Sequence, residues 1–69
     1  MLNYDLIIKD QSGILKTASL GHNLSVEKVK ENRVTAIESF KLDVIAKNIE
    51  IDEPLETTII TWGTPEKVE

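Results

Sequence analysis

Hydrophobic and polar residues alternate at the start of the chain, in the stretch NYDLIIKD at residues 3–10. On an extended backbone, Leu6 lies on one side with the other even-numbered apolar residues, and Ile7 lies on the opposite side. The letters DQSG suit a type I turn in which Gly13 takes a positive φ. Residues 14–21, ILKTASLG, then continue as a second strand. The pattern therefore predicts a β-hairpin.

After Ser25, apolar residues recur at steps of three and four residues instead of alternating. On a helix these residues form an apolar stripe along one side, and Asn23 or Ser25 can cap the start of the helix. Arg33 interrupts the stripe, which is tolerable because a long basic side chain can lay its stem along an apolar surface. The pattern predicts a helix over residues 25–46. The members of the stripe are Val26, Val29, Ile37, Phe40 and Val44.

The second half of this segment also fits a strand, because apolar residues alternate with polar ones from Phe40 to Lys47. The alternative fold is therefore mostly β, with a short helix near residues 25–33 followed by an extended strand. The two periods cannot hold together, and we favour the long helix.

The stretch ETTIITWG, residues 56–63, predicts a third strand, because it is rich in β-branched residues and contains the only tryptophan. Pro54 makes a helix unfavourable just before it. The face of this strand that carries Trp62 has the larger side chains, so it is the heavier of the two faces. We expect the heavier face to look inward, which would make Trp62 a core anchor.

The order strand, strand, helix, strand predicts a small α+β fold, a ββαβ sandwich in which one helix lies on one face of a three-stranded sheet. Residues 1–69 are expected to form a single small domain. Within it, residues 64–69 are expected to be an acidic tail that can remain disordered.

The composition limits how such a chain can be stabilised. A domain of 69 residues buries only roughly 60 % of the surface that its unfolded form exposes. The chain has no cysteine for a disulfide and one histidine, so it cannot form a Cys/His zinc set. We therefore expect no metal and no cofactor. Assembly with another protein is the remaining source of added stability, and the alternative is a well-packed monomer, since many domains of about this size fold alone.

The formal net charge is −4, and it is unevenly distributed. Residues 1–24 are balanced, residues 25–48 sum to +1 and residues 49–69 sum to −5. Phosphate binding needs a basic surface, so direct nucleic-acid binding is disfavoured. Lys28, Lys30 and Arg33 alternate with glutamates, and this pattern is typical of a solvated, mixed-charge helix face.

The face of the sheet opposite the helix is the predicted protein interface. Uncovered apolar residues on a sheet mark contact surfaces, and both sheet edges carry unpaired backbone groups. We predict a non-enzymatic protein-binding or assembly module that docks to itself, as a homo-oligomer, or to a larger complex. The residues assigned to this interface are Ile7, Leu15, Ile59, Thr61 and Trp62.

A second hypothesis uses the acidic segment. Four carboxylates before and at the start of the last strand could bind the basic site of a nucleic-acid-handling protein. The chain would then be an acidic inhibitor or regulator of the phage or mobile-element accessory type. The residues of this acidic partner surface are Glu50, Asp52, Glu53 and Glu56.

Other classes are disfavoured by what the sequence lacks. It contains no glycine-rich phosphate loop, no cysteine nucleophile and no histidine pair, so we expect no catalytic residue and no enzymatic activity. No stretch approaches the roughly 20 apolar residues that span a bilayer, and the start of the chain lacks the features of a secretory signal. We therefore expect a cytoplasmic protein that does not bind a membrane.

Overall fold

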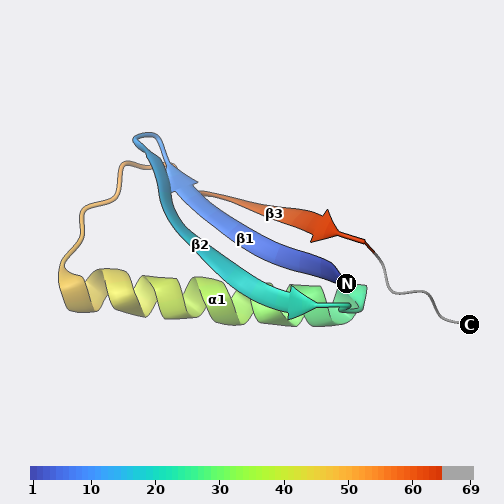
Figure 1. The fold of residues 1–69 in the computed structure, drawn as a ribbon. Helices are drawn as coiled ribbons and strands as arrows, with labels where there is room; N and C mark the ends of the chain where they lie inside the picture. Colours follow the sequence, from blue (N-terminus) through green and yellow to red (C-terminus); the bar gives the residue numbers. More distant parts are fainter. Residues whose placement is uncertain (65–69) are drawn as a thin grey trace, which may run out of the picture.

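The computed structural model describes residues 1–64 and contains one antiparallel sheet of three strands and one α-helix (Figure 1). The strand order is β2-β1-β3, so β1 is central and both β2 and β3 are edge strands. This arrangement confirms the ββαβ fold. The predicted tail lies, apart from Thr64, outside the described residues. The elements are β1 (Leu2–Asp10), β2 (Gly13–His22), α1 (Val26–Lys47) and β3 (Glu56–Gly63).

The helix has capped ends that fix its length. At the start, the backbone N–H of Lys28 donates to Ser25 Oγ (3.2 Å), and at the end Asn48 takes the left-handed conformation with a φ of 53°. The predicted long helix is confirmed, and the alternative of a short helix followed by a strand is wrong. Helical spacing prevails because it brings Val29, Ala36 and Phe40 onto the sheet together, where Phe40 is buried.

The core lies between α1 and the central strand. Leu6 and Ile8 of β1 are completely buried, because β1 has a strand on each side and the helix over one face. Leu20 of β2 and Phe40 of α1 complete the buried cluster. The predicted hairpin of β1 and β2 is confirmed, and Gly13 ends its turn with a φ of 134°.

Two β-bulges in β2 change which residues face the helix. The pairing with β1 skips Leu15 and Leu20, so each is an extra residue in the ladder. A bulge shifts the alternation by one residue, and both leucines consequently pack against the core. The prediction that Leu15 lies on the open face of the sheet is therefore wrong, because strict alternation does not allow for the bulge.

The register of β3 reverses the faces expected from the sequence. Ile59 pairs with Leu6 and Thr61 pairs with Tyr4, and directly paired residues point to the same face. Ile59 and Thr61 are therefore on the helix side, contrary to prediction. Trp62 lies on the open side and is 56 % exposed, so the prediction that it anchors the core is wrong. The register of β3 is set by the buried side chains of β1, and not by the size of the side chains on β3.

Asp10 joins the hairpin turn to the segment before β3. Its side chain is buried and accepts hydrogen bonds from the Ser12 hydroxyl (2.5 Å) and from the backbone N–H of Asp52 (2.8 Å). In return, the backbone N–H of Gln11 donates to the carbonyl of Asp52 (3.2 Å). The Ser12 hydroxyl, and then the Asp52 N–H, hold the pKa of Asp10 below its ordinary value of 3.8.

We expect Asp10→Asn to lower the free energy of unfolding at neutral pH, because an amide accepts these hydrogen bonds less well and places its own N–H groups among donors. The folded state lowers the pKa of Asp10, so its stabilisation is complete above 3.8 and is lost as the pH falls through the folded value. Urea denaturation at neutral and strongly acidic pH should therefore show a difference from wild type that shrinks in acid. A difference that is equal at both pH values would contradict this account.

The packing of α1 predicts a contrast between two neighbouring positions. Phe40→Ala should lower the free energy of unfolding by about 3 kcal/mol, because it removes the helix side chain at the centre of the core. Leu42→Ala should change it by less than about 0.5 kcal/mol, because Leu42 is 68 % exposed. Thermal and urea denaturation of dilute protein measure both values. Equal losses at the two positions would contradict the orientation of the helix.

Candidate protein-docking surface

The single helix covers only part of the sheet. Within residues 1–64, the backbone of α1 lies close to β1 and β2 but not to β3, and Figure 1 shows β3 on the far side of β1 from β2. No side chain of β3 is fully buried, although Ile59 packs against the edge of the core. The helix-facing side of β3 therefore remains accessible.

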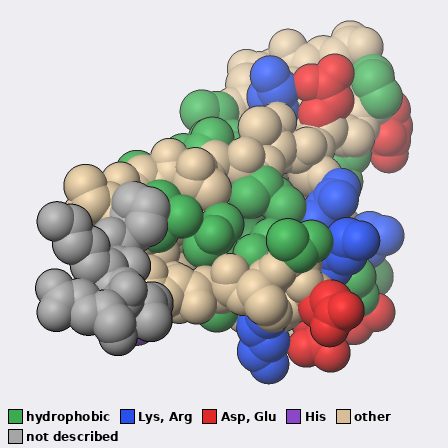
Figure 2. Space-filling model, turned by 90° about the vertical axis from the view of Figure 1, so that its right-hand side faces the viewer, with side chains coloured by type: hydrophobic (Ala, Val, Ile, Leu, Met, Phe, Trp, Pro, Cys, Tyr) green, Lys and Arg blue, Asp and Glu red, His purple; other side chains and the backbone are tan. Residues whose placement is uncertain are grey.

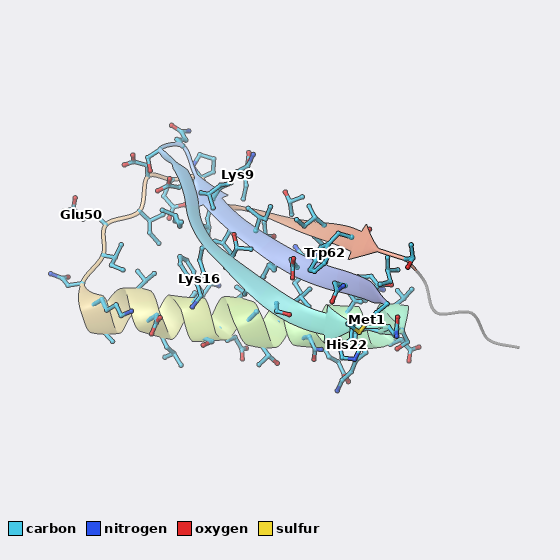
Figure 3. The ribbon with its side chains drawn as sticks, viewed as in Figure 1. Met1, Lys9, Lys16, His22, Glu50 and Trp62 are labelled. Carbon is cyan, nitrogen blue, oxygen red and sulfur yellow. The ribbon has the colours of Figure 1, made fainter. Side chains whose placement is uncertain are left out.

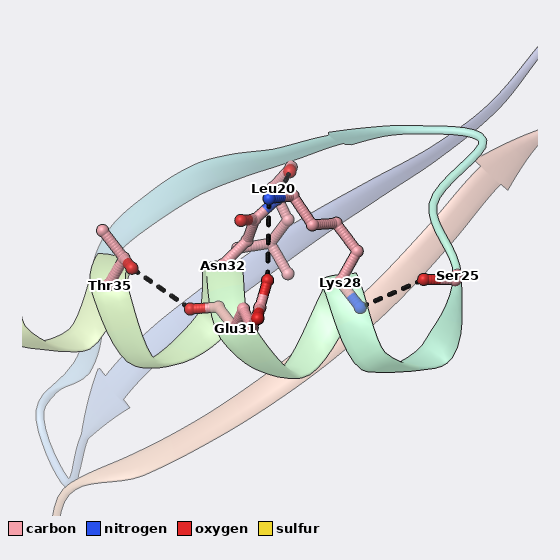
Figure 4. Close-up of polar contacts among 6 residues, drawn as sticks. All are labelled: Leu20, Ser25, Lys28, Glu31, Asn32 and Thr35. Atoms are coloured by element: carbon pink, nitrogen blue, oxygen red, sulfur yellow. Dashed lines mark hydrogen bonds and ion pairs between the residues drawn. The ribbon is translucent and has the colours of Figure 1, made fainter.

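The flank of α1 that faces β2 carries polar side chains that pair with β2, and Figure 4 shows Asn32 beside Leu20. The side-chain amide of Asn32 donates to the backbone carbonyl of Leu20 on β2 (2.8 Å). Farther along the helix, Asp43 forms an ion pair with Lys16 of β2 (3.8 Å), and Figure 3 shows Lys16 between β2 and α1. This flank has its partners within the chain.

The flank of α1 that faces β3 is different. At about 100° per residue, Val26, Ile37 and Val44 fall on this side of the helix. Arg33, which interrupts the apolar stripe in the sequence, reaches across to β3, where its Nη2 donates to the hydroxyl of Thr57 (2.9 Å). The flank thus combines apolar side chains with basic ones, and Arg33 bridges it to the sheet.

Between this flank and β3 lies a groove with a volume of about 300 Å³. We call it the α1–β3 groove. Figure 2 views the molecule from the end at which β3 terminates. On the face toward the viewer, hydrophobic side chains gather in the middle, with Lys and Arg side chains beside them. Val26 at its mouth is 72 % exposed. The lining residues are Tyr4, Leu24, Val26, Val29, Lys30, Arg33 and Ile59.

Among residues 1–64, some Lys and Arg side chains form ion pairs and others form none. Lys9, Lys16, Lys28 and Lys47 form ion pairs with carboxylates. Lys30, Arg33 and Lys41 form none with any residue from 1 to 64, and all three are on the side of α1 that turns toward β3. Lys30 and Arg33, predicted to belong to a solvated mixed-charge face, therefore border an apolar groove.

The open face of the sheet is a second exposed surface. Ile7 lies there between Thr17 of β2 and Thr58 of β3. Trp62 is on the same face, and its indole N–H donates to Asp5 (2.5 Å). Trp62 lies near the end of β3 (Figure 3). Ile60, which is 39 % exposed, lies beside Trp62 on the same face of β3, so this face carries apolar side chains among hydroxyl and carboxylate groups.

The predicted interface residues do not form one surface. Ile7 and Trp62 are on the open face, Leu15 packs against the core, and Ile59 and Thr61 are on the helix side. Of these five, Ile59 lines the α1–β3 groove. The sequence pattern does not single out the other groove residues, although the difference between the two helix flanks is a signal for them.

The predicted acidic partner surface is an extended segment. Glu50, Asp52 and Glu53 are exposed on the segment between α1 and β3, and Figure 3 shows Glu50 beyond the end of the helix. Glu56 is at the start of β3, where it pairs with Lys9 of β1 (3.6 Å). The four carboxylates are therefore spread along the chain and do not surround one cavity.

Residues 1–64 contain no group of three or more His, Asp or Glu side chains placed to hold a metal ion. In the same part of the chain, no helix has the length and apolar character that crossing a membrane requires. Comparison with protein-family models, curated proteins and solved structures found no match to this chain. The function must therefore be inferred from the surface described above.

Proposed function

We propose that this protein is a non-enzymatic protein-binding or assembly module, and that its partner docks in the α1–β3 groove. The observation that carries the proposal is the incomplete helix layer, which leaves an apolar groove of about 300 Å³ beside a three-stranded sheet. In a chain of this size, apolar surface that the fold cannot bury itself is usually buried against another protein.

The chemistry of the groove favours a protein segment with aliphatic or aromatic side chains. Its lining includes Tyr4, Leu24, Val29 and Ile59, which provide contacts for such side chains but few hydrogen bonds. Lys30 at the rim can pair with a carboxylate of the bound segment and set its orientation.

The free edge of β3 adds to the same surface. Its pairing with β1 contains no bulge, and Glu56 is its only charged residue. The other edge strand, β2, carries two bulges, which are a common protection against unwanted strand pairing. The backbone groups of β3 can therefore extend the contact made in the groove.

The acidic segment supports the alternative less well. An inhibitor that mimics nucleic acid needs carboxylates gathered on one surface, and here they lie along a connecting segment with Glu56 already paired to Lys9. Occupation of the basic site of another protein by these residues stays a prediction from the sequence.

Photocrosslinking tests the proposed site directly. The crosslinking residue p-benzoylphenylalanine would replace Val26 at the mouth of the groove, and Thr35 on the far side of the helix would serve as the matched control. Both positions are exposed on α1. We expect protein adducts from position 26 in the organism that carries the gene, and few from position 35.

The outcome at the control position decides the interpretation. Equal yields at the two positions would mean that the groove is not a specific surface, and an absence of adducts from position 26 would contradict the proposed function. The open face of the sheet would then be tested through a crosslinking residue at Ile14, which is exposed on β2.

A further inference from the structure

A row of exposed side chains follows α1 beside the groove and is centred on Val34. Val34 is 55 % exposed and Ile45, farther along the row, is 76 % exposed. We call this set the Val34 row. Besides Val34, its members lie within about 40° of Val34 around the helix axis at about 100° per residue, and they are Glu27, Lys30, Glu38, Lys41 and Ile45.

The charges in the Val34 row change sign about its centre. Lys30 lies four residues before Val34, and Glu38 lies four residues after it. In the same way, Glu27 and Lys41 are seven residues before and after it. Each charged residue of the row therefore has a residue of opposite charge at the same distance on the other side of Val34.

This pattern is complementary to itself. When two identical helices pack antiparallel about a two-fold axis at Val34, each residue lies opposite the one at equal distance on the other side of the centre. Lys30 then meets Glu38 of the second copy, and Glu27 meets Lys41. By symmetry both contacts occur twice, and the two Val34 side chains meet at the axis.

We infer that the partner of this surface is a second copy of the chain, with the two α1 helices packed antiparallel through the Val34 row. The inference rests on the proposed function, because it names the protein that docks on the α1–β3 side.

The ion pairs within one chain support a second copy. Among residues 1–64, none of the four charged residues in the row forms an ion pair, although four other lysines do. An acidic segment of a foreign protein would neutralise Lys30 and Lys41 but would bring like charge to Glu27 and Glu38. A second copy satisfies both signs at once.

The same arrangement brings Ile45 of the second copy to one end of the groove. The half of α1 that follows Val34 in the second copy lies beside the half that precedes it in the first. Ile45 of the second copy falls opposite Asn23, next to Leu24, which lines the groove. Val34 and Ile45 are 55 % and 76 % exposed in the single chain, so the pairing buries apolar surface on both copies.

The test is a charge exchange at the inner pair, followed by sedimentation equilibrium over a wide concentration range. Lys30→Glu and Glu38→Lys should each weaken dimerisation roughly tenfold, because attraction becomes repulsion at two symmetric contacts. The double variant, with both changes in one chain, should recover the affinity of the wild type. An equimolar mixture of the two single variants should also dimerise, since each then meets the opposite charge.

Lys28→Glu is the matched control, because it makes the same charge change on the same helix but outside the Val34 row. It should leave the dimer unchanged, and circular dichroism should show that every variant keeps its helix. A wild-type protein that stays monomeric at all concentrations would overturn the inference. So would a dimer that neither single reversal weakens, or a mixture that fails to recover.

The results that would overturn the second copy can be distinguished from those that would overturn the proposed function. A monomer that still gives adducts from position 26 with other proteins would overturn the second copy and leave the docking surface in place. A monomer without such adducts would overturn both.

Discussion

A single α-helix is about 10 Å wide and neighbouring strands are about 4.8 Å apart, so one helix can cover about two strands. This sheet has three. The helix lies over β1 and β2, which completely buries Leu6 and Ile8 and leaves Ile59 of β3 only half-buried. The core, the bare side of β3 and the α1–β3 groove all follow from this mismatch between the width of the helix layer and the width of the sheet.

The sequence predicts the elements well because their signals are local. Alternation defines β1, DQSG defines the turn, and the stripe that contains Phe40 defines the helix. The faces of β2 and β3 depend on pairing with distant residues, and there the prediction fails. A bulge turns Leu15 inward, and the register with β1 turns Trp62 outward. The groove needs both the helix position and the strand order, so only the asymmetry of the helix flanks hints at it.

The incomplete helix layer also links stability to assembly. The chain has no cysteine, and residues 1–64 have a small core of four buried apolar residues, so covering the groove would add apolar burial that the monomer lacks. Asp10 holds one end of β3 in place through Asp52, whereas the rest of the strand depends on pairing with β1. Strand β3 is therefore the element expected to open most easily in the free chain, and the one that a bound partner would stabilise most.

Our interpretation is that two copies of this protein assemble through the α1–β3 side, and not through the open face of the sheet. Methyl NMR spectra recorded over a series of protein concentrations test it most directly. We expect the resonances of Val26, Val34 and Ile45 to shift together as the concentration rises, while those of Ile7 and Ile14 on the open face stay constant. Shifts confined to Ile7 and Ile14, or no shift at any concentration, would contradict it.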